Sequence, residues 1–308
     1  MKILVVGGAG LLGEHLVRAL MLEGHTVTIL SRRSSGRTGA FGEGVRFISS
    51  LEEWGRAEFF DTVINLAGAP IADYPWTAAR QRVLWQSRVE LTEKLVDKFT
   101  RLPRPPTVLI SASAIGYYQA DSRGDSEIDE RGAQGKDFSA HLCRAWESAA
   151  QRAQSHGTRV CVVRTGLVLT PQGGVLSRLV LPGGWGLQAG EGHQGFSWIH
   201  VADWVRAVEF LMASPRAVGP YNLTAPQFLS QADFMRGLRE SGMTRRTLRI
   251  PAPVVRFMLG KRATLLLEGV KAAPAQLLSE GFQFEFPELC QALGQLRGFC
   301  AGKGPHFI

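Results

Sequence analysis

The chain has 308 residues, of which 45% are hydrophobic and 20% charged, so it can bury a core and is not intrinsically disordered. No apolar run approaches the roughly 18 residues of a membrane helix, and the first residues lead into a glycine loop rather than a cleavable signal. We therefore expect a cytoplasmic protein with no membrane partner. The net charge of +8 comes from scattered arginines, which favours the steering of anionic small molecules and argues against nucleic-acid binding.

Short runs of Val, Ile and Leu alternate with helical patterns over the first two thirds of the chain. Predicted strands cover residues 2–7, 26–31, 45–48, 62–66, 107–112 and 159–164, and predicted helices cover 11–23, 77–99, 137–155 and 203–213. Near-continuous apolar strands joined by helices are typical of a parallel sheet buried on both faces. The sequence thus predicts an α/β fold with a doubly wound parallel sheet of the Rossmann type.

A glycine loop follows the first predicted strand and opens the first predicted helix. Its glycines, Gly7, Gly10 and Gly13, have the spacing of a dinucleotide-binding loop. Glycine is needed there for the tight turn, for close approach to a diphosphate and for packing of the helix on the strand. The amides of the first helical turn, including Leu11 and Leu12, would then face the phosphates.

The second predicted strand ends in Ser31-Arg32-Arg33. Proteins that bind NAD usually place a carboxylate here, where it accepts hydrogen bonds from the ribose hydroxyls. Two guanidinium groups and a hydroxyl instead suit a 2′-phosphate, which arginine can hold with paired hydrogen bonds. We therefore predict that the cofactor is NADP(H).

The later part of the chain is less regular. Residues 173–195 are rich in glycine and predict loops over a site, the acidic stretch 121–130 predicts a solvated lid, and residues 282–286 predict a short strand. We expect a Rossmann domain over residues 1–220 and a smaller α+β lobe over 221–308, interleaved with it on the substrate side. The 4 cysteines do not have the spacing of a zinc site, and no metal is expected.

Several segments together resemble the epimerase-like branch of the extended short-chain dehydrogenase/reductase superfamily, in which a C-terminal domain of unknown function follows the Rossmann domain. The resemblance implies NADP(H) binding near Asn65, Ala67, Gly68, Arg88 and Thr165, and a homodimer formed through the long helices. The segments that carry it are Asn65-Leu66-Ala67-Gly68, Ser87-Arg88, Ser113-Ala114-Ile115-Gly116-Tyr117-Tyr118, Arg164-Thr165-Gly166-Leu167, Trp198-Ile199-His200-Val201-Ala202-Asp203 and the stretch from 251 to 287.

The catalytic residues of that superfamily are only partly present. Ser113 matches the serine that polarises the substrate, at the end of the fifth predicted strand. The proton-transferring tyrosine with a lysine four residues later is missing, and alignment on Trp146-Glu147 puts Ser139 and Cys143 in their places. A phenol is a poor base near neutral pH unless a cation favours its ionised form. The residues four beyond each tyrosine, Tyr74, Tyr117, Tyr118 and Tyr221, are Ala78, Asp121, Ser122 and Ala225.

Two functions remain open at this point. The first is an oxidoreductase or epimerase-like enzyme that acts on a carbonyl or secondary alcohol of unknown identity, with Ser113 polarising the substrate and Tyr117 donating the proton. Tyr118, His200 and Glu147 are weaker candidates, and His200 is more easily explained as a hydrogen-bonded core residue. The second is a non-catalytic NADP(H)-binding redox sensor or regulatory protein, including one linked to division. The missing tyrosine and lysine favour this second function.

Overall fold

The computed structural model describes residues 1–32, 41, 44–120 and 127–301, and Arg33 lies outside these ranges. One large sheet has the strand order β13-β7-β5-β4-β1-β2-β3, and every neighbouring pair in it is parallel. This confirms the predicted Rossmann-type sheet. Its strands are β1 (Lys2–Val6), β2 (Thr26–Leu30), β3 (Arg46–Ile48), β4 (Thr62–Asn65), β5 (Val108–Ala114), β7 (Arg159–Thr165) and β13 (Gly219–Leu223).

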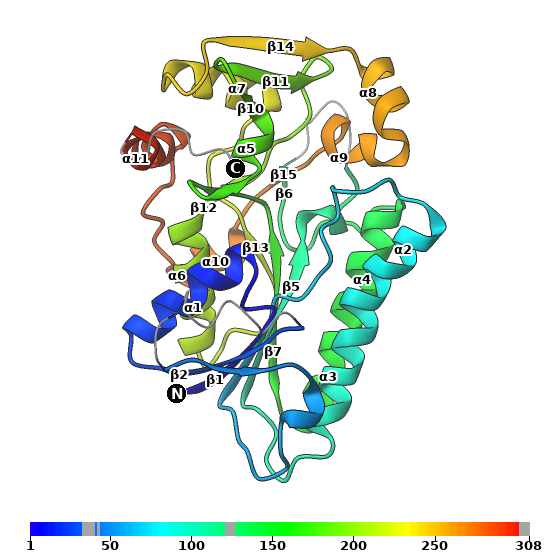
Figure 1. Ribbon diagram of the computed structural model, residues 1–308, viewed down its shortest axis with the longest axis vertical. Helices are drawn as coiled ribbons and strands as arrows, with labels where there is room; N and C mark the ends of the chain where they lie inside the picture. The colour runs from blue at the N-terminus through cyan, green and yellow to red at the C-terminus, as the bar shows by residue number, and fades with distance from the viewer. Residues whose placement is uncertain (33–40, 42–43, 121–126, 302–308) are drawn as a thin grey trace.

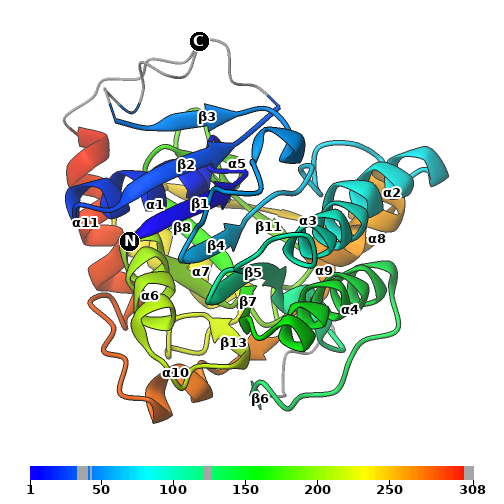
Figure 2. The same ribbon diagram turned by 90° about the horizontal axis from the view of Figure 1, so that it is seen from below.

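Helices cover both faces of this sheet, as Figure 2 shows from below. On one face α1 (Leu11–Leu22) and α6 (Val201–Ala213) bury Leu16, Leu20 and Trp204 in one apolar cluster. On the other face α3 (Leu91–Phe99) and α4 (Phe138–Gln151) contribute to a second. The strands are mostly apolar because both of their faces are buried.

The helix predicted over 77–99 is interrupted. It begins as α2 (Ala78–Trp85), capped by the Thr77 side chain, passes through a π-helical turn η3 (Gln86–Glu90) and continues as α3. Such turns place one residue out of the regular helical register and are frequent at functional sites. Short 3-10 turns lie at η2 (Leu51–Glu53), η4 (Ile115–Tyr117), η5 (Arg152–His156) and η6 (Gly260–Ala263).

A smaller lobe stands over the carboxyl-terminal edge of the large sheet (Figure 1). It combines residues before and after β13, because β11 (Trp185–Ala189) pairs in parallel with β14 (Arg246–Ile250). Its other elements are β8 (Leu167–Thr170), β9 (Gly173–Gly174), α5 (Leu176–Leu179), β10 (Val180–Leu181), β12 (Trp198–His200), α7 (Gln231–Glu240), α8 (Ala252–Leu259), α9 (Thr264–Leu267) and α11 (Leu289–Ala301). Three short elements, β6 (Glu127–Ile128), β15 (Lys271–Ala272) and α10 (Ala275–Ser279), lie beside the junction of the two lobes.

Two predictions made from local pattern were wrong. Residues 173–195 are not only loops, since they contain β9, α5, β10 and β11. One partner of β11, the short strand β10, is adjacent in the chain, but the other, β14, lies about sixty positions further along, beyond any local signal. Residues 282–286 are not a strand. The buried Asp203 carboxylate accepts the amides of Glu285 and Phe286, both at 2.8 Å, in place of a neighbouring strand.

Candidate functional site

The strands of the large sheet end at one edge because they are all parallel. In register, Asn65 of β4 lies beside Ser111 of β5, and Ala114 of β5 beside Thr165 of β7. The predicted cofactor and catalytic residues therefore gather at this edge, beneath the smaller lobe. Open α/β sheets bind ligands at this carboxyl-terminal edge.

The glycine loop is built by close backbone contacts. Gly7 has a positive φ of 81°, and its amide donates to the carbonyl of Leu30 at 3.0 Å. A Cβ on Gly13 would lie 2.6 Å from the Cα of Gly8, and one on Gly10 would lie 3.3 Å from the carbonyl oxygen of Gly7. The glycines thus let α1 begin directly against the loop. The first helical turn leaves its amides, among them those of Leu11 and Leu12, without intrahelical acceptors, and these attract anions.

Ser31 and Arg32 follow β2 immediately, beside the loop. The Ser31 amide donates to the carbonyl of Ile48 at 3.0 Å, which holds this turn against β3, and Arg32 is exposed. An exposed guanidinium here can meet a phosphate on the adenosine ribose.

Asn65 is buried, and both ends of its amide are used inside the protein. Nδ2 donates to Oγ1 of Thr92 at 2.8 Å, and Oδ1 accepts the amide of Ala67 at 3.3 Å. Within the protein, the Asn65 side chain shapes the turn at Ala67 and Gly68, and its contact with a cofactor stays a prediction. A Cβ built on Gly7 would lie 3.0 Å from the Cα of Ala67, so this turn packs against the glycine loop.

Thr165 ends β7 half-buried, and its hydroxyl accepts the indole N–H of Trp204 at 3.1 Å. Its backbone lies at the edge where a cofactor would pass. The side chain is tied to α6.

Ser113 forms part of a buried ion-pair network. Its Oγ lies 2.6 Å from Oε1 of Glu147, and Glu147 makes a two-point ion pair with Arg164, with Nε to Oε1 at 2.9 Å and Nη2 to Oε2 at 2.8 Å. All three side chains are at most 5% exposed. An ionised carboxylate only accepts hydrogen bonds, so the single Ser113 proton goes to Glu147. In this arrangement Ser113 cannot also donate to a substrate carbonyl, as the sequence comparison implied.

Tyr118 extends this network and serves structure. Its hydroxyl donates to Oδ1 of Asn222 at 2.6 Å and accepts Nη1 of Arg164 at 3.0 Å. Burial raises the pKa of Tyr118 to about 12, so it stays protonated at neutral pH. Burial lowers the pKa of Arg164, but the hydrogen bonds and charge of Glu147 outweigh it and leave the pKa raised.

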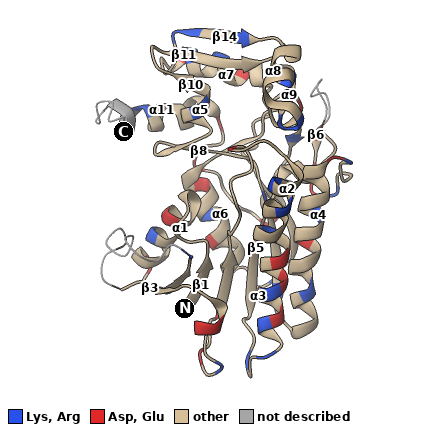
Figure 3. Cartoon of the chain, turned by 45° about the vertical axis from the view of Figure 1, so that its right-hand side comes forward, with Lys and Arg blue, Asp and Glu red and all other residues tan. Residues whose placement is uncertain are grey.

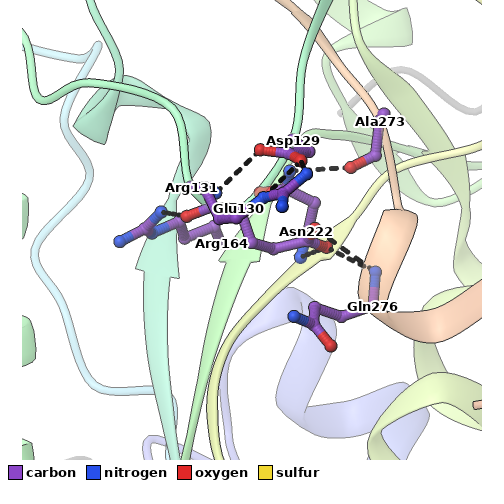
Figure 4. Close-up of polar contacts among 7 residues, drawn as sticks. All are labelled: Asp129, Glu130, Arg131, Arg164, Asn222, Ala273 and Gln276. Atoms are coloured by element: carbon purple, nitrogen blue, oxygen red, sulfur yellow. Dashed lines mark hydrogen bonds and ion pairs between the residues drawn. The ribbon is translucent and has the colours of Figure 1, made fainter. Parts of the chain in front are cut away.

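Glu130 connects the network to segments nearer the C-terminus, and Figure 4 shows its contacts with Asn222 and Gln276. Its carboxylate accepts the amides of Asn222 at 3.0 Å and Gln276 at 3.3 Å, and its carbonyl accepts Nη1 of Arg164. Asn222 also donates to the carbonyl of Ala273 at 2.8 Å. The prediction of a solvated lid over 121–130 is thus wrong for Glu130, which is buried with its pKa raised by desolvation; residues 121–126 lie outside the described ranges.

Tyr117 lies on the turn η4 with its ring face against the guanidinium of Arg164, whose Cζ is 3.6 Å from the ring centroid. This turn also contacts α4. A Cβ built on Gly116 would lie 3.5 Å from Cβ of Ser139, so the turn packs on the helix at the position where the superfamily has its tyrosine.

His200 is a hydrogen-bonded core residue. Nδ1 accepts the amide of Ala202 at 3.2 Å and Nε2 lies 3.1 Å from Oε1 of Gln295, while the ring packs on Phe286. Burial lowers the pKa of His200, which keeps the ring neutral.

Two contacts tie the loop after β4 to the smaller lobe. Asp73 forms an ion pair with Arg178 of α5, and Arg262 of η6 donates to the carbonyl of Ala72 at 2.9 Å. Gly174 of β9, just before α5, also lies next to the start of α1, since a Cβ on Gly174 would lie 3.4 Å from a methyl group of Leu11. The pair of Asp73 and Arg178, hereafter the clasp, therefore joins the two borders of the edge where a dinucleotide would lie.

Few features of the sequence predict this network. The usable signal was a charge next to an apolar run: Arg164 directly follows Val160-Cys161-Val162-Val163, and Glu147 follows Trp146 on a largely buried helix face. Across the described residues, no three His, Cys, Asp or Glu side chains gather as a metal site would require, and no described helix is both long and apolar enough to cross a bilayer.

A parallel sheet with a glycine loop after its first strand, and with a smaller lobe over its carboxyl-terminal edge, is the architecture of the extended short-chain dehydrogenase/reductase class. The chain belongs to the NAD dependent epimerase/dehydratase family, whose model matches residues 3–224. A domain of unknown function, DUF1731, matches residues 250–296.

Similar proteins extend over nearly the whole chain. An epimerase family protein of Mycobacterium bovis is 36% identical, with 94% of this chain and 95% of the relative covered. Epimerase family protein SDR39U1 of Homo sapiens is 34% identical, with 96% and 99% covered. The crystal structure of human SDR39U1 (isoform 2) with NADPH superposes with a TM-score of 0.87 at 33% identity, over 97% of this chain and 99% of that one. These comparisons bear out the resemblance seen in the sequence.

Proposed function

We propose that this protein binds NADP(H) along the carboxyl-terminal edge of its large sheet and acts as an oxidoreductase or epimerase-like enzyme on a carbonyl or secondary alcohol. The observation that carries the proposal is the glycine loop lying beside Ser31 and Arg32, with no carboxylate in the Ser31-Arg32-Arg33 segment. The human relative crystallised with NADPH supports the choice of cofactor.

The residues present fit this group. Gly7 and Gly13 allow the close backbone packing that sets the loop against the first turn of α1, and that turn offers amides to a diphosphate. Arg32 and Ser31 would hold the 2′-phosphate, and Ala67, Gly68 and the backbone of Thr165 would border the nicotinamide half. When bound, the dinucleotide supplies or accepts a hydride, while the protein orients it and excludes water.

A second function is favoured by one observation. The proton of Ser113 is committed to Glu147, and α4 carries neither the tyrosine nor the lysine of the usual proton-transfer pair. An NADP(H)-binding sensor or regulator would need only the cofactor site.

The test begins with titration of the purified protein with NADPH and NADH. We expect NADPH to bind about ten- to a hundredfold more tightly, because a charged hydrogen bond contributes about 1.5–3 kcal/mol. Arg32→Ala should remove most of that preference. The control Arg101→Ala replaces an exposed arginine that follows α3, far from the cofactor edge, and should leave it intact. A preference for NADH that Arg32→Ala does not alter would overturn the cofactor assignment.

NADPH oxidation against a panel of aldehydes, ketones and sugar nucleotides then separates the two functions. Turnover accelerated by one compound class supports the enzyme. Tight NADPH binding with no accelerated turnover supports the sensor.

A further inference from the structure

Arg88 is placed at the cofactor edge by the π-helical turn of residues Gln86–Glu90. Thr92 fixes its backbone, since Oγ1 of Thr92 donates to the carbonyl of Arg88 at 2.6 Å. The same oxygen accepts Nδ2 of Asn65 at 2.8 Å and the indole N–H of Trp146 at 3.0 Å. Hydrogen bonds thereby hold the turn to the end of β4 and to α4, and they fix the position of Arg88 in the fold.

The guanidinium of Arg88 lies against the turn that follows β4. Nη1 donates to the carbonyl of Ala69 at 3.0 Å, and Cζ is 5.3 Å from the ring centroid of Trp146. A Cβ on Gly68 would come within 2.9 Å of Cζ, so the glycine leaves room for the head group. Among contacts within the described residues, only one of the two terminal nitrogens has hydrogen-bond partners.

Among the described residues, this guanidinium forms no ion pair with a carboxylate, and no carboxylate influences its pKa. Burial lowers the pKa of Arg88, the nearby Cys143 thiol opposes that shift, and the charge of Arg80 lowers the pKa further. Removing a cation from water without a partner is costly, so such groups are usually paired with an anion or with a ligand. The unbalanced guanidinium therefore indicates a ligand rather than a structural role.

Arg88 lies close to Cys143, the position on α4 where the superfamily has its lysine. The two side chains lie near enough to perturb each other electrostatically. Burial raises the pKa of Cys143 to about 12, so the thiol is neutral and cannot itself replace an ammonium group. The cation of this site thus comes from the π-helical turn instead of from α4.

We propose that Arg88 is the relocated positive charge of the site and holds the ribose hydroxyls of the nicotinamide half of NADP(H). The inference rests on the proposed cofactor. It assigns Arg88 to the nicotinamide end, whereas Arg32 serves the adenosine end. Arg88 is a positioning residue, because a guanidinium does not give up its proton near neutral pH.

Two ligands separate these roles: NADPH, and ADP carrying a 2′-phosphate, which keeps every phosphate of the adenosine half and lacks the nicotinamide riboside. We expect Arg88→Ala to weaken NADPH binding about ten- to a hundredfold and to leave binding of the truncated ligand within about twofold. Arg32→Ala should weaken both. The matched control is Arg82→Ala, an exposed arginine of α2, which should change neither.

A lysine returned to α4 provides a rescue. In the Arg88→Ala background, Cys143→Lys should recover part of the NADPH affinity, because the ammonium would reach the space that the guanidinium left. Since Cys143 is buried, this double variant can fail to fold; Arg88→Lys then takes its place and should lose less NADPH affinity than Arg88→Ala. Thermal melting without ligand identifies variants that are folded.

The outcomes are distinguishable. Equal weakening of NADPH and of the truncated ligand by Arg88→Ala, or no weakening of either in a folded variant, overturns the role proposed for Arg88. Failure of the unmodified protein to bind either ligand overturns the proposed cofactor itself.

Discussion

At the scale of single residues, Glu147 decides what its neighbours can do. It accepts the proton of Ser113 and neutralises Arg164, and Arg164 in turn positions the rings of Tyr117 and Tyr118. A serine that the sequence marks as catalytic is therefore a member of a buried polar network. Any substrate oxygen at this edge would meet the lone pairs of Ser113 rather than its proton.

Replacing Glu147 with glutamine tests how much this network contributes to the free energy of unfolding. The amide still accepts from Ser113, but the Arg164 guanidinium loses its counter-charge inside the protein. We expect Glu147→Gln to lower the free energy of unfolding by about 3–5 kcal/mol, measured by urea denaturation.

The control for this prediction is Arg152→Ala, which breaks an exposed pair with Asp97 at 2.9 Å. Exposed pairs contribute about 0–1 kcal/mol. If Glu147→Gln costs no more than Arg152→Ala, the buried pair is not a stabilising unit and its proposed role is wrong.

At the scale of elements, the junction between the glycine loop and α1 depends on close approach of backbone to backbone. A Cβ on Gly13 would meet the Cα of Gly8 at 2.6 Å and the carbonyl oxygen of Gly7 at 2.7 Å. Neither atom belongs to a side chain that can move aside. The loop must therefore deform if Gly13 is replaced.

We expect Gly13→Ala to cost about 1–3 kcal/mol of stability through overpacking. NADPH affinity should fall at least about tenfold in titration, since amides displaced from their positions lose their hydrogen bonds to the diphosphate. Gly55→Ala is the matched control, because a Cβ there meets nothing within 4 Å. Unchanged NADPH affinity in Gly13→Ala would contradict the assignment of this loop.

The elements that the sequence predicted well are those defined by local pattern. The strands Lys2–Val6, Thr26–Leu30 and Arg159–Thr165 are rich in Val, Ile and Leu on both faces, so their burial could be anticipated. The pairing of β11 with β14 could not, because it joins segments separated by β12, α6, β13 and α7. The π-helical turn at Arg88 likewise leaves no pattern in residues 77–99 that differs from a continuous helix.

At the scale of the whole molecule, the clasp links the Rossmann domain to the smaller lobe. Asp73 belongs to the loop after β4, while Arg178 belongs to α5, next to the segment that touches Leu11. Figure 3 colours the Lys and Arg positions along the chain, and several of them in the smaller lobe lie on β14 and near α8 and α9. We therefore expect the clasp to restrain a dinucleotide bound at this edge.

We expect Arg178→Ala to speed NADPH release up to about fivefold in stopped-flow fluorescence, since an exposed ion pair contributes up to about 1 kcal/mol. The difference from the unmodified protein should shrink in high salt, which screens the pair. Arg236→Ala breaks an exposed pair with Asp233 on α7, away from the cofactor edge, and should not alter release. Equal release rates for Arg178→Ala and the unmodified protein at low salt would show that the clasp does not restrain the cofactor.

By itself the sequence determined the Rossmann sheet, the glycine loop and the basic turn after β2, because each depends on residues adjacent in the chain. Only the tertiary structure decided which groups surround Ser113, Asn65 and Arg88. Their partners, Glu147, Thr92 and Trp146, come from other elements, and hydrogen bonds and burial between distant segments settle where a proton or a charge resides. A side chain's chemistry follows from its type, but whether that chemistry is free to act depends on the neighbours that the fold brings to it.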